Sequence, residues 1–118
     1  MAKIFVVDDE VGICDILEVF LKRNGHEVTV SSDALEALEI IKKDGSFDLL
    51  ILDHRMPKME GGAVIQNIRE MGNKTPVLLL TGSVGMEVQG LGADAVLMKP
   101  VDLNMLLEKV EELLGKNG

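Results

Sequence analysis

Residues 4–9 read Ile-Phe-Val-Val-Asp-Asp, an apolar run of strand length that stops at two carboxylates. Three more apolar runs stop at a polar residue in the same way: 49–52 before Asp53, 77–80 before Thr81, and 95–98 before Lys99. A short continuous apolar run is typical of a strand that is buried on both faces, as in parallel sheets. If these runs share one parallel sheet, their carboxyl ends meet at one edge, where open α/β sheets bind their ligands.

Helical patterns lie between these runs, so strand and helix signals alternate along the chain. The expected strands are residues 4–7, 27–31, 49–53, 77–81 and 95–98. The expected helices are residues 11–24, a second helix capped by Ser32 and Asp33, residues 63–71 and residues 103–114. Gly85, Gly90 and Gly92 each cost about 1 kcal/mol relative to alanine inside a helix, so any helix between residues 82 and 92 is expected to be short.

Apolar residues at helical spacing predict the buried face of each helix. The expected buried residues are Val11, Cys14, Leu17 and Leu21 in the first helix, Leu35, Leu38 and Ile41 in the second, and Val64, Ile68 and Met71 in the third. Asp33 followed by Glu36 resembles a capping box at the start of the second helix. Cys14 is interpreted as a small core residue rather than a reactive thiol.

Alternating strands and helices with short connections predict an α/β protein with a parallel sheet, and right-handed crossovers place helices on both of its faces. The chain has 118 residues and is expected to form a single domain that spans residues 1–118. Hydrophobic residues make up 47% of the sequence, which is enough for a packed core, and charged residues make up 27%, which is close to the globular average.

Composition also argues against several locations and partners. No apolar stretch approaches the roughly 18 residues of a membrane span, and the N-terminus lacks the cleavage site of a signal peptide. Cys14 is the only cysteine, which fits a reducing compartment. The net charge of -8 disfavours a nucleic-acid groove, because phosphates require clustered lysine and arginine. We therefore expect a cytoplasmic protein with no membrane partner and no direct nucleic acid binding.

Each polar residue at a strand end has an ordinary structural explanation when it is taken alone. The acidic residues 8–10 could cap the first helix and stabilise its positive end. Thr81 could belong to a turn, and Lys99 could be a solvated charge before Pro100. These explanations do not account for the placement of all these residues at one edge of the sheet.

Three carboxylates at this edge repel one another. Asp8, Asp9 and Asp53 would repel by roughly 3 to 4 kcal/mol per pair at separations of about 4 to 6 Å near a protein surface. The total approaches the stability of a whole domain. Lys99 balances one of the three charges and leaves two. Mg²⁺ binds one or two carboxylates and keeps waters that phosphate oxygens can replace, so the sequence predicts a Mg²⁺ site that stabilises the fold.

A carboxylate beside a metal ion, a hydroxyl and an ammonium can attack a phosphoryl group and hold the resulting acyl phosphate. The same residues resemble the receiver domain of two-component response regulators. The resemblance covers essentially the whole chain and rests on Asp8-Asp9-Glu10, Asp53 followed by Met56-Pro57-Lys58-Met59-Glu60-Gly61, Thr81-Gly82, Gly92-Ala93-Asp94 and Lys99-Pro100. It implies a flavodoxin-like doubly wound (βα)5 fold with strand order 2-1-3-4-5. The stretch from Thr81 to Lys99 is about four residues shorter than in typical receivers, so the fourth helix is expected to be shortened by roughly one turn.

The resemblance implies a phosphorylation-switched signalling module rather than an enzyme with turnover. Asp53 would accept a phosphoryl group from a phosphohistidine on a sensor histidine kinase or a histidine phosphotransfer protein. Thr81 and Lys99 would each contact a phosphoryl oxygen, and the peptide bond before Pro100 would be cis.

The resemblance also implies the ligands of the Mg²⁺ ion. Asp9 would bind the ion directly and Asp8 through water, with Asp53 and the backbone carbonyl of Arg55 as further ligands.

Residues near the predicted phosphoacceptor and the predicted hydroxyl receive two smaller interpretations. Arg55 and Ser83 lie two places after Asp53 and Thr81, positions that flank the path of attacking water in this family, so they are expected to set the lifetime of the acyl phosphate. His54 follows Asp53 directly, and strand alternation turns it away from its neighbour, so it is interpreted as a rim or packing residue.

The residue at the usual switch position also departs from the family pattern. Receivers usually carry Tyr or Phe three residues before the lysine, where this chain has Val96, and the sequence contains no Tyr or Trp. The aromatic part of the usual activation switch is therefore missing.

Three other functions remain open at this stage. A phosphatase of the haloacid dehalogenase class also uses an aspartyl nucleophile with Mg²⁺, but its second acid is missing from Asp53-His54-Arg55. A flavodoxin-like FMN protein is disfavoured because the first turn after a strand is acidic where a phosphate loop is needed. The third alternative is a receiver-shaped interaction module that is not phosphorylated in the cell.

Overall fold

The structure is a computed structural model that describes residues 2–82 and 90–115. In this part of the chain the strands are β1 (Lys3–Val7), β2 (Glu27–Ser31), β3 (Leu49–Asp53), β4 (Val77–Thr81) and β5 (Ala95–Met98), and the helices are α1 (Val11–Arg23), α2 (Ala34–Lys43), α3 (Gly61–Glu70) and α4 (Leu103–Gly115). The strands pair in parallel in the order β2-β1-β3-β4-β5, which confirms the flavodoxin-like doubly wound sheet. The short helix expected between residues 82 and 92 falls mostly on positions outside the described residues.

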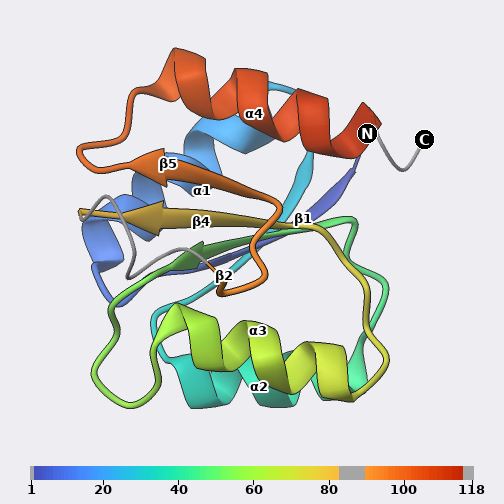
Figure 1. Cartoon of the computed structure of the whole chain (residues 1–118). Coiled ribbons are helices and arrows are strands. Elements are labelled where there is room, and N and C mark those ends of the chain that lie inside the picture. The colour runs from blue at the N-terminus through green and yellow to red at the C-terminus, as the bar shows by residue number, and fades with distance from the viewer. Residues whose placement is uncertain (1, 83–89, 116–118) are drawn as a thin grey trace.

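Helices cover both faces of the sheet. Figure 1 shows α1 and α4 on one face and α2 and α3 on the other. Alternate residues of β1 enter the two cores: Ile4 and Val6 pack with α1 and α4, whereas Phe5 and Val7 pack with α2 and α3. Because both faces are covered, polar side chains can gather only where the strands end.

Three residues predicted to be buried are exposed. Val11 is 59% exposed because it opens α1, three residues before the first buried position of that helix. Leu35 is 45% exposed, because the buried face of α2 is formed by other residues of the helix, which are Ala34, Ala37, Leu38 and Ile41. Met71 is 42% exposed because it lies just past the end of α3. Within the helix, Ile65 joins Val64 and Ile68 on the buried face.

The predicted capping box forms only in part. The Asp33 carboxylate accepts the backbone N–H groups of Leu35 and Glu36 at 2.8 and 3.1 Å, as an N-cap does. The Glu36 carboxylate accepts the Ser31 hydroxyl at 2.8 Å, and the Asp33 N–H donates to that same hydroxyl oxygen. The serine at the end of β2 therefore mediates the second half of the cap.

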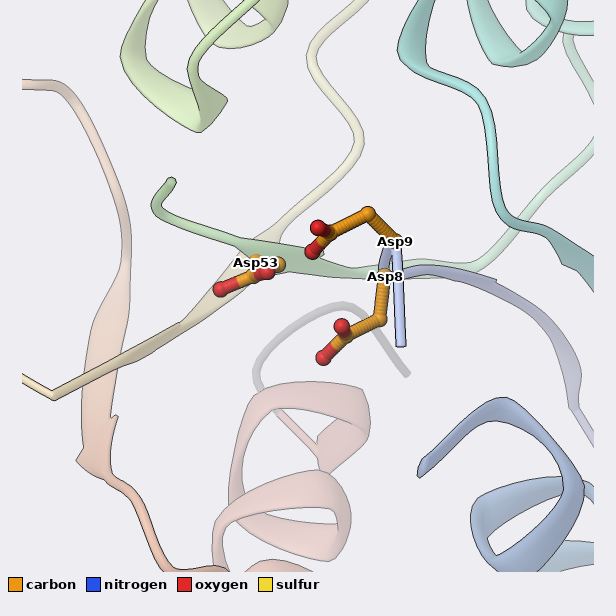
Figure 2. Close-up of side chains that lie close together, drawn as sticks. All are labelled: Asp8, Asp9 and Asp53. Carbon is orange, nitrogen blue, oxygen red and sulfur yellow. The ribbon is translucent and has the colours of Figure 1, made fainter. Parts of the chain in front are cut away.

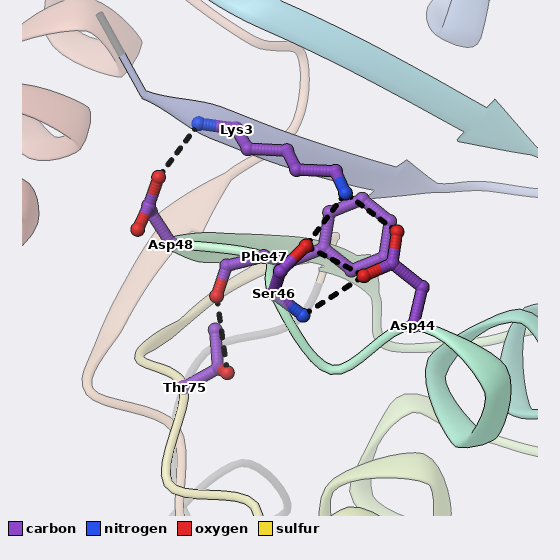
Figure 3. A network of polar contacts seen from close by, with 6 residues as sticks. All are labelled: Lys3, Asp44, Ser46, Phe47, Asp48 and Thr75. Carbon is purple, nitrogen blue, oxygen red and sulfur yellow. Dashed lines mark hydrogen bonds and ion pairs between the residues drawn. The ribbon is translucent and has the colours of Figure 1, made fainter.

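A polar network fixes the opposite end of the sheet (Figure 3). The ammonium of Lys3 contacts Asp44 and Ser46 and lies 4.9 Å from the centre of the Phe47 ring. The backbone N–H of Lys3 donates to Asp48 at 2.8 Å. These contacts join the start of β1 to the connection that leads into β3, and so hold the two central strands side by side.

None of the helices in the described residues is long and apolar enough to cross a membrane.

The start of α3 lies two residues earlier than predicted because of close packing. A Cβ atom on Gly61 would lie 2.5 Å from the carbonyl oxygen of Asp53 and 2.9 Å from Leu79. The Gly61 N–H also donates to the carbonyl of His54 at 2.8 Å. Glycine is therefore required where the helix touches the end of β3, although its low helix propensity suggested a later start.

We expect Gly61→Ala to lower the free energy of unfolding by about 1 to 3 kcal/mol, because backbone atoms of β3 must move to admit the methyl group. Gly12→Ala in α1 is the matched control, since among the described residues no atom outside the adjacent turns of α1 lies within 4 Å of a Cβ there. It should raise stability by up to about 1 kcal/mol. Urea unfolding of both variants gives the comparison, and equal stability of the two would contradict the packing argument.

Candidate functional site

The polar residues that end the strands line one cavity of about 350 Å³ at the carboxyl edge of the sheet. The cavity is lined by Asp9, Glu10, Asp53, His54, Arg55, Thr81, Gly82 and Lys99. Asp8 lies beneath it and is fully buried. The expected convergence of the strand ends is therefore observed.

Parallel register brings the first two acids together. Val7 of β1 pairs with Leu52 of β3, so the next residues, Asp8 just past the end of β1 and Asp53 at the end of β3, lie side by side. One Asp8 carboxylate oxygen accepts the N–H of Glu10 at 2.9 Å, which closes a tight turn directly after β1. This turn holds the Asp8 side chain beneath the cavity.

The same register places the hydroxyl and the ammonium. Thr81 of β4 pairs with Met98 of β5, and Lys99 follows immediately. The Lys99 N–H donates to the Thr81 carbonyl at 2.8 Å, so the two backbones are joined at the point where they enter the cavity. The peptide bond between Lys99 and Pro100 is cis, as the resemblance implied.

Three carboxylates form a compact cluster, shown in Figure 2. Asp8, Asp9 and Asp53 each offer an oxygen atom, and these atoms lie within 4.8 Å of one another. Asp8 and Asp53 are 0% and 4% exposed, whereas Asp9 is exposed. Oxygen ligands at this spacing are what a hard divalent cation requires.

Lys99 partly balances the cluster. Its ammonium lies 3.0 Å from Asp8 Oδ2, 3.2 Å from Asp53 Oδ1 and 3.2 Å from Glu10 Oε1. Burial opposes its charge, but the hydrogen bond and the attraction of Asp8, followed by those of Asp53 and Glu10, raise the pKa of Lys99 above its ordinary value. The lysine is therefore firmly cationic.

One ammonium does not satisfy the whole cluster. Burial, followed by a hydrogen bond that protonated Asp53 donates to Asp9 and by repulsion from Asp8, raises the pKa of Asp53 to about 7 despite the opposing effect of Lys99. Asp8 Oδ2 is buried, and the Lys99 ammonium lies 3.0 Å from it. Three carboxylates with one ammonium beside them leave an oxygen-only donor set that fits Mg²⁺.

The remaining predicted residues lie near the cluster in different ways. Thr81 is buried at its edge, and Arg55 is exposed at the mouth of the cavity. His54 is 4% exposed, which confirms the interpretation of a packing residue. Ser83 lies outside the described residues.

Sequence reasoning missed the role of Glu10. It was interpreted as part of a helix cap, but its side chain makes no capping hydrogen bond and contacts Lys99 instead. The signal was available, because Glu10 follows Asp9 at the edge where Lys99 was expected.

A doubly wound parallel sheet with three acids and a lysine at its carboxyl edge defines the class of two-component receivers. The sequence matches the response regulator receiver domain family over residues 4–111. It is 39% identical to the response regulator MprA of Mycobacterium leprae (strain TN), over 97% of this chain and 51% of that protein. The MprA of Mycobacterium tuberculosis (strain CDC 1551 / Oshkosh) is 40% identical with the same coverage. The chain thus spans about half the length of the curated relatives it matches.

Solved structures give the same answer. The receiver domain of the Francisella response regulator 1452 superposes with a TM-score of 0.91 at 26% identity, and covers 100% of both chains. The chemotaxis protein CheY4 of Vibrio cholerae superposes with a TM-score of 0.88 at 32% identity, over 96% of this chain and 98% of that one. The chain belongs to the response regulator receiver domain family of two-component signalling. This membership sets aside the phosphatase and flavin-binding interpretations.

The raised pKa of Asp53 makes stability depend on pH in the absence of metal. The folded protein holds a proton on Asp53 up to about pH 7, whereas the unfolded chain loses it near 3.8. Folding therefore binds a proton in this window, so the contribution of Asp53 to stability falls as pH rises from about 4 to 7.

We expect Asp53→Asn to be more stable than the parent by about 1 to 3 kcal/mol at pH 8, with the difference shrinking towards pH 4. Urea unfolding in EDTA at several pH values measures this difference. Asp15→Asn, an exposed acid of α1 outside the cavity, is the control. A gain in Asp53→Asn that stays constant across this range would contradict the argument.

Proposed function

We propose that this chain is a phosphorylation-switched signalling module of a phosphorelay. It accepts a phosphoryl group from a phosphohistidine of a sensor histidine kinase or a histidine phosphotransfer protein onto Asp53. The observation that carries this proposal is the buried Asp53 carboxylate, held between two other acids and 3.2 Å from the Lys99 ammonium.

The transfer is a displacement at phosphorus. An Asp53 oxygen forms the new O–P bond while the P–N bond to the donor imidazole breaks and the imidazole nitrogen keeps the electron pair. The phosphoryl oxygens then carry negative charge inside the cavity, where the Lys99 ammonium and the Thr81 hydroxyl can face them. In this proposal the chain catalyses only its own phosphorylation and dephosphorylation.

Asp8, Asp9, Asp53 and the backbone carbonyl of Arg55 are proposed to hold Mg²⁺. When bound, the ion neutralises the acids and stabilises charge on the transferred phosphoryl group. The support for this assignment is the oxygen-only donor set, in which three carboxylates have one ammonium to balance them.

A groove beside the cavity is proposed to receive the donor protein. It has a volume of about 670 Å³ and shares Glu10 and Lys99 with the wall of the cavity. Its other lining is mostly apolar and includes Ile16, which is 56% exposed. An apolar helix face of the donor seated there would lie next to the nucleophile.

The remaining expectations are part of the same proposal. Residues 1–118 act as one receiver domain in the cytoplasm, without direct nucleic acid binding and without a membrane partner. The net charge of -8 supports the absence of a groove for the phosphate backbone of nucleic acid. Arg55 and Ser83 are proposed to govern the lifetime of the acyl phosphate.

Incubation with acetyl phosphate and Mg²⁺ should add one phosphoryl group to the protein, because Asp53 then has a small-molecule donor in place of the kinase. Intact mass spectrometry detects the added group. Asp53→Asn should gain nothing, whereas Asp15→Asn should react like the parent. Failure of the parent to react would favour the interaction module that is never phosphorylated.

Magnesium should stabilise the parent in thermal melts at neutral pH, since it binds a cluster that exists only in the folded state. A concentration ten times the dissociation constant contributes about 1.4 kcal/mol, or roughly 5 °C. Asp9→Asn should lose most of this shift, and sodium chloride of equal ionic strength should not reproduce it. Equal shifts in the parent and in Asp9→Asn would count against the site.

A further inference from the structure

The backbone and the side chain of Glu10 belong to two different parts of the structure. Its backbone is the N-cap of α1, yet its side chain makes no capping hydrogen bond. The carboxylate turns instead to Lys99, 89 positions away in the sequence, and lies 3.2 Å from its ammonium. Glu10 and Lys99 both line the cavity and the neighbouring groove, so this ion pair lies between the two spaces.

Glu10 also differs from the other acids that surround Lys99. Asp8 and Asp53 belong to the cluster whose oxygens lie within 4.8 Å of one another, and Glu10 does not. A divalent cation held by the cluster would balance two of its three charges, and Lys99 balances the third, so Glu10 remains as an additional carboxylate on the same ammonium. The Glu10 side chain is 62% exposed, whereas that of Lys99 is only 16% exposed.

We propose that Glu10 is a positioning residue that slows phosphorylation by competing for Lys99. Among the described residues, Glu10 is the carboxylate outside the proposed cation site that contacts the ammonium, and it attracts Lys99 away from an incoming phosphoryl oxygen. This inference rests on the proposed function of the site, because it assumes that Lys99 faces the phosphoryl group.

The reaction used for the test involves no redox step and no proton transfer from Lys99. An Asp53 oxygen forms a bond to phosphorus, the P–O bond to the acetyl group breaks, and acetate leaves with the electron pair. Lys99 contributes only its charge and its hydrogen bonds. Glu10 therefore acts on the rate through the location of that charge.

Glu10→Gln should raise the rate of phosphorylation by acetyl phosphate at saturating Mg²⁺ by about two- to fivefold, the size expected from losing a partly exposed ion pair. Glu27→Gln is the matched control, because Glu27 is an exposed acid at the opposite end of the sheet, in the first position of β2. It should react at the rate of the parent.

A double-mutant cycle separates contact with Lys99 from simple removal of a negative charge. In a Lys99→Met background, Glu10→Gln should give no gain, because no ammonium remains to be released. An equal gain in both backgrounds would overturn the proposal and indicate repulsion of the anionic donor. A rate that is unchanged or lower in Glu10→Gln alone would also overturn it.

A measurement without metal or donor tests the contact itself. The ammonium resonance of Lys99 in ¹H–¹⁵N spectra should shift in Glu10→Gln and remain in place in Glu27→Gln. An unshifted resonance would overturn the proposal, and this comparison decides the matter if the Lys99→Met background does not react. Absence of any phosphoryl group on the parent would instead refute the proposed function, whatever the resonance does.

Discussion

The repulsion among three carboxylates at one edge of the sheet is the constraint around which this structure is arranged. Asp8 and Asp53 are almost completely buried, and like charges at about 4 Å repel by roughly 4 kcal/mol near a protein surface. Lys99 offsets part of this repulsion, but burial first, and then the contact with Asp9 and the repulsion from Asp8, still raise the pKa of Asp53. The rest of the fold must therefore supply the stability that the site removes.

That stability comes from the two cores on either side of the sheet and from the network at its far end. The central strands are apolar up to the residue at which each one stops, so the cluster interrupts neither core. Lys3 ties β1 to the connection before β3 at the amino end, far from the charges. Because β1 and β3 are fixed there and paired along their length, Asp8 and Asp53 cannot separate without breaking strand pairing.

The strand order, the cluster and the lysine could be predicted because they follow from strand patterns and from a known family. The face of each helix was less certain, since Leu35 satisfies the same spacing as its buried neighbours and only the packing of Ala34 against the core decides between them. The start of α3 was also missed, because propensity disfavours Gly61 and the space beside Asp53 requires it. The contact between Glu10 and Lys99 was not predicted, because the position of Glu10 before α1 suggested a helix cap. A sequence motif does not specify the direction in which a side chain points.

The residues around the site also limit how a change in the cavity can alter the surface of the domain. Val96 lies on the edge strand β5 at the position where receivers usually have an aromatic ring, and it is 40% exposed. Because valine has no ring, the usual rotation of an aromatic side chain cannot take place at this position. The described residues still contain a direct link, because the Lys99 N–H is bonded to the Thr81 carbonyl and β4 and β5 are paired up to that point. A movement of Thr81 towards a phosphoryl group would therefore pull on the backbone of Lys99. Among the described residues, the edge strand β5 and the backbone of Lys99 are therefore the elements that these hydrogen bonds couple to Thr81.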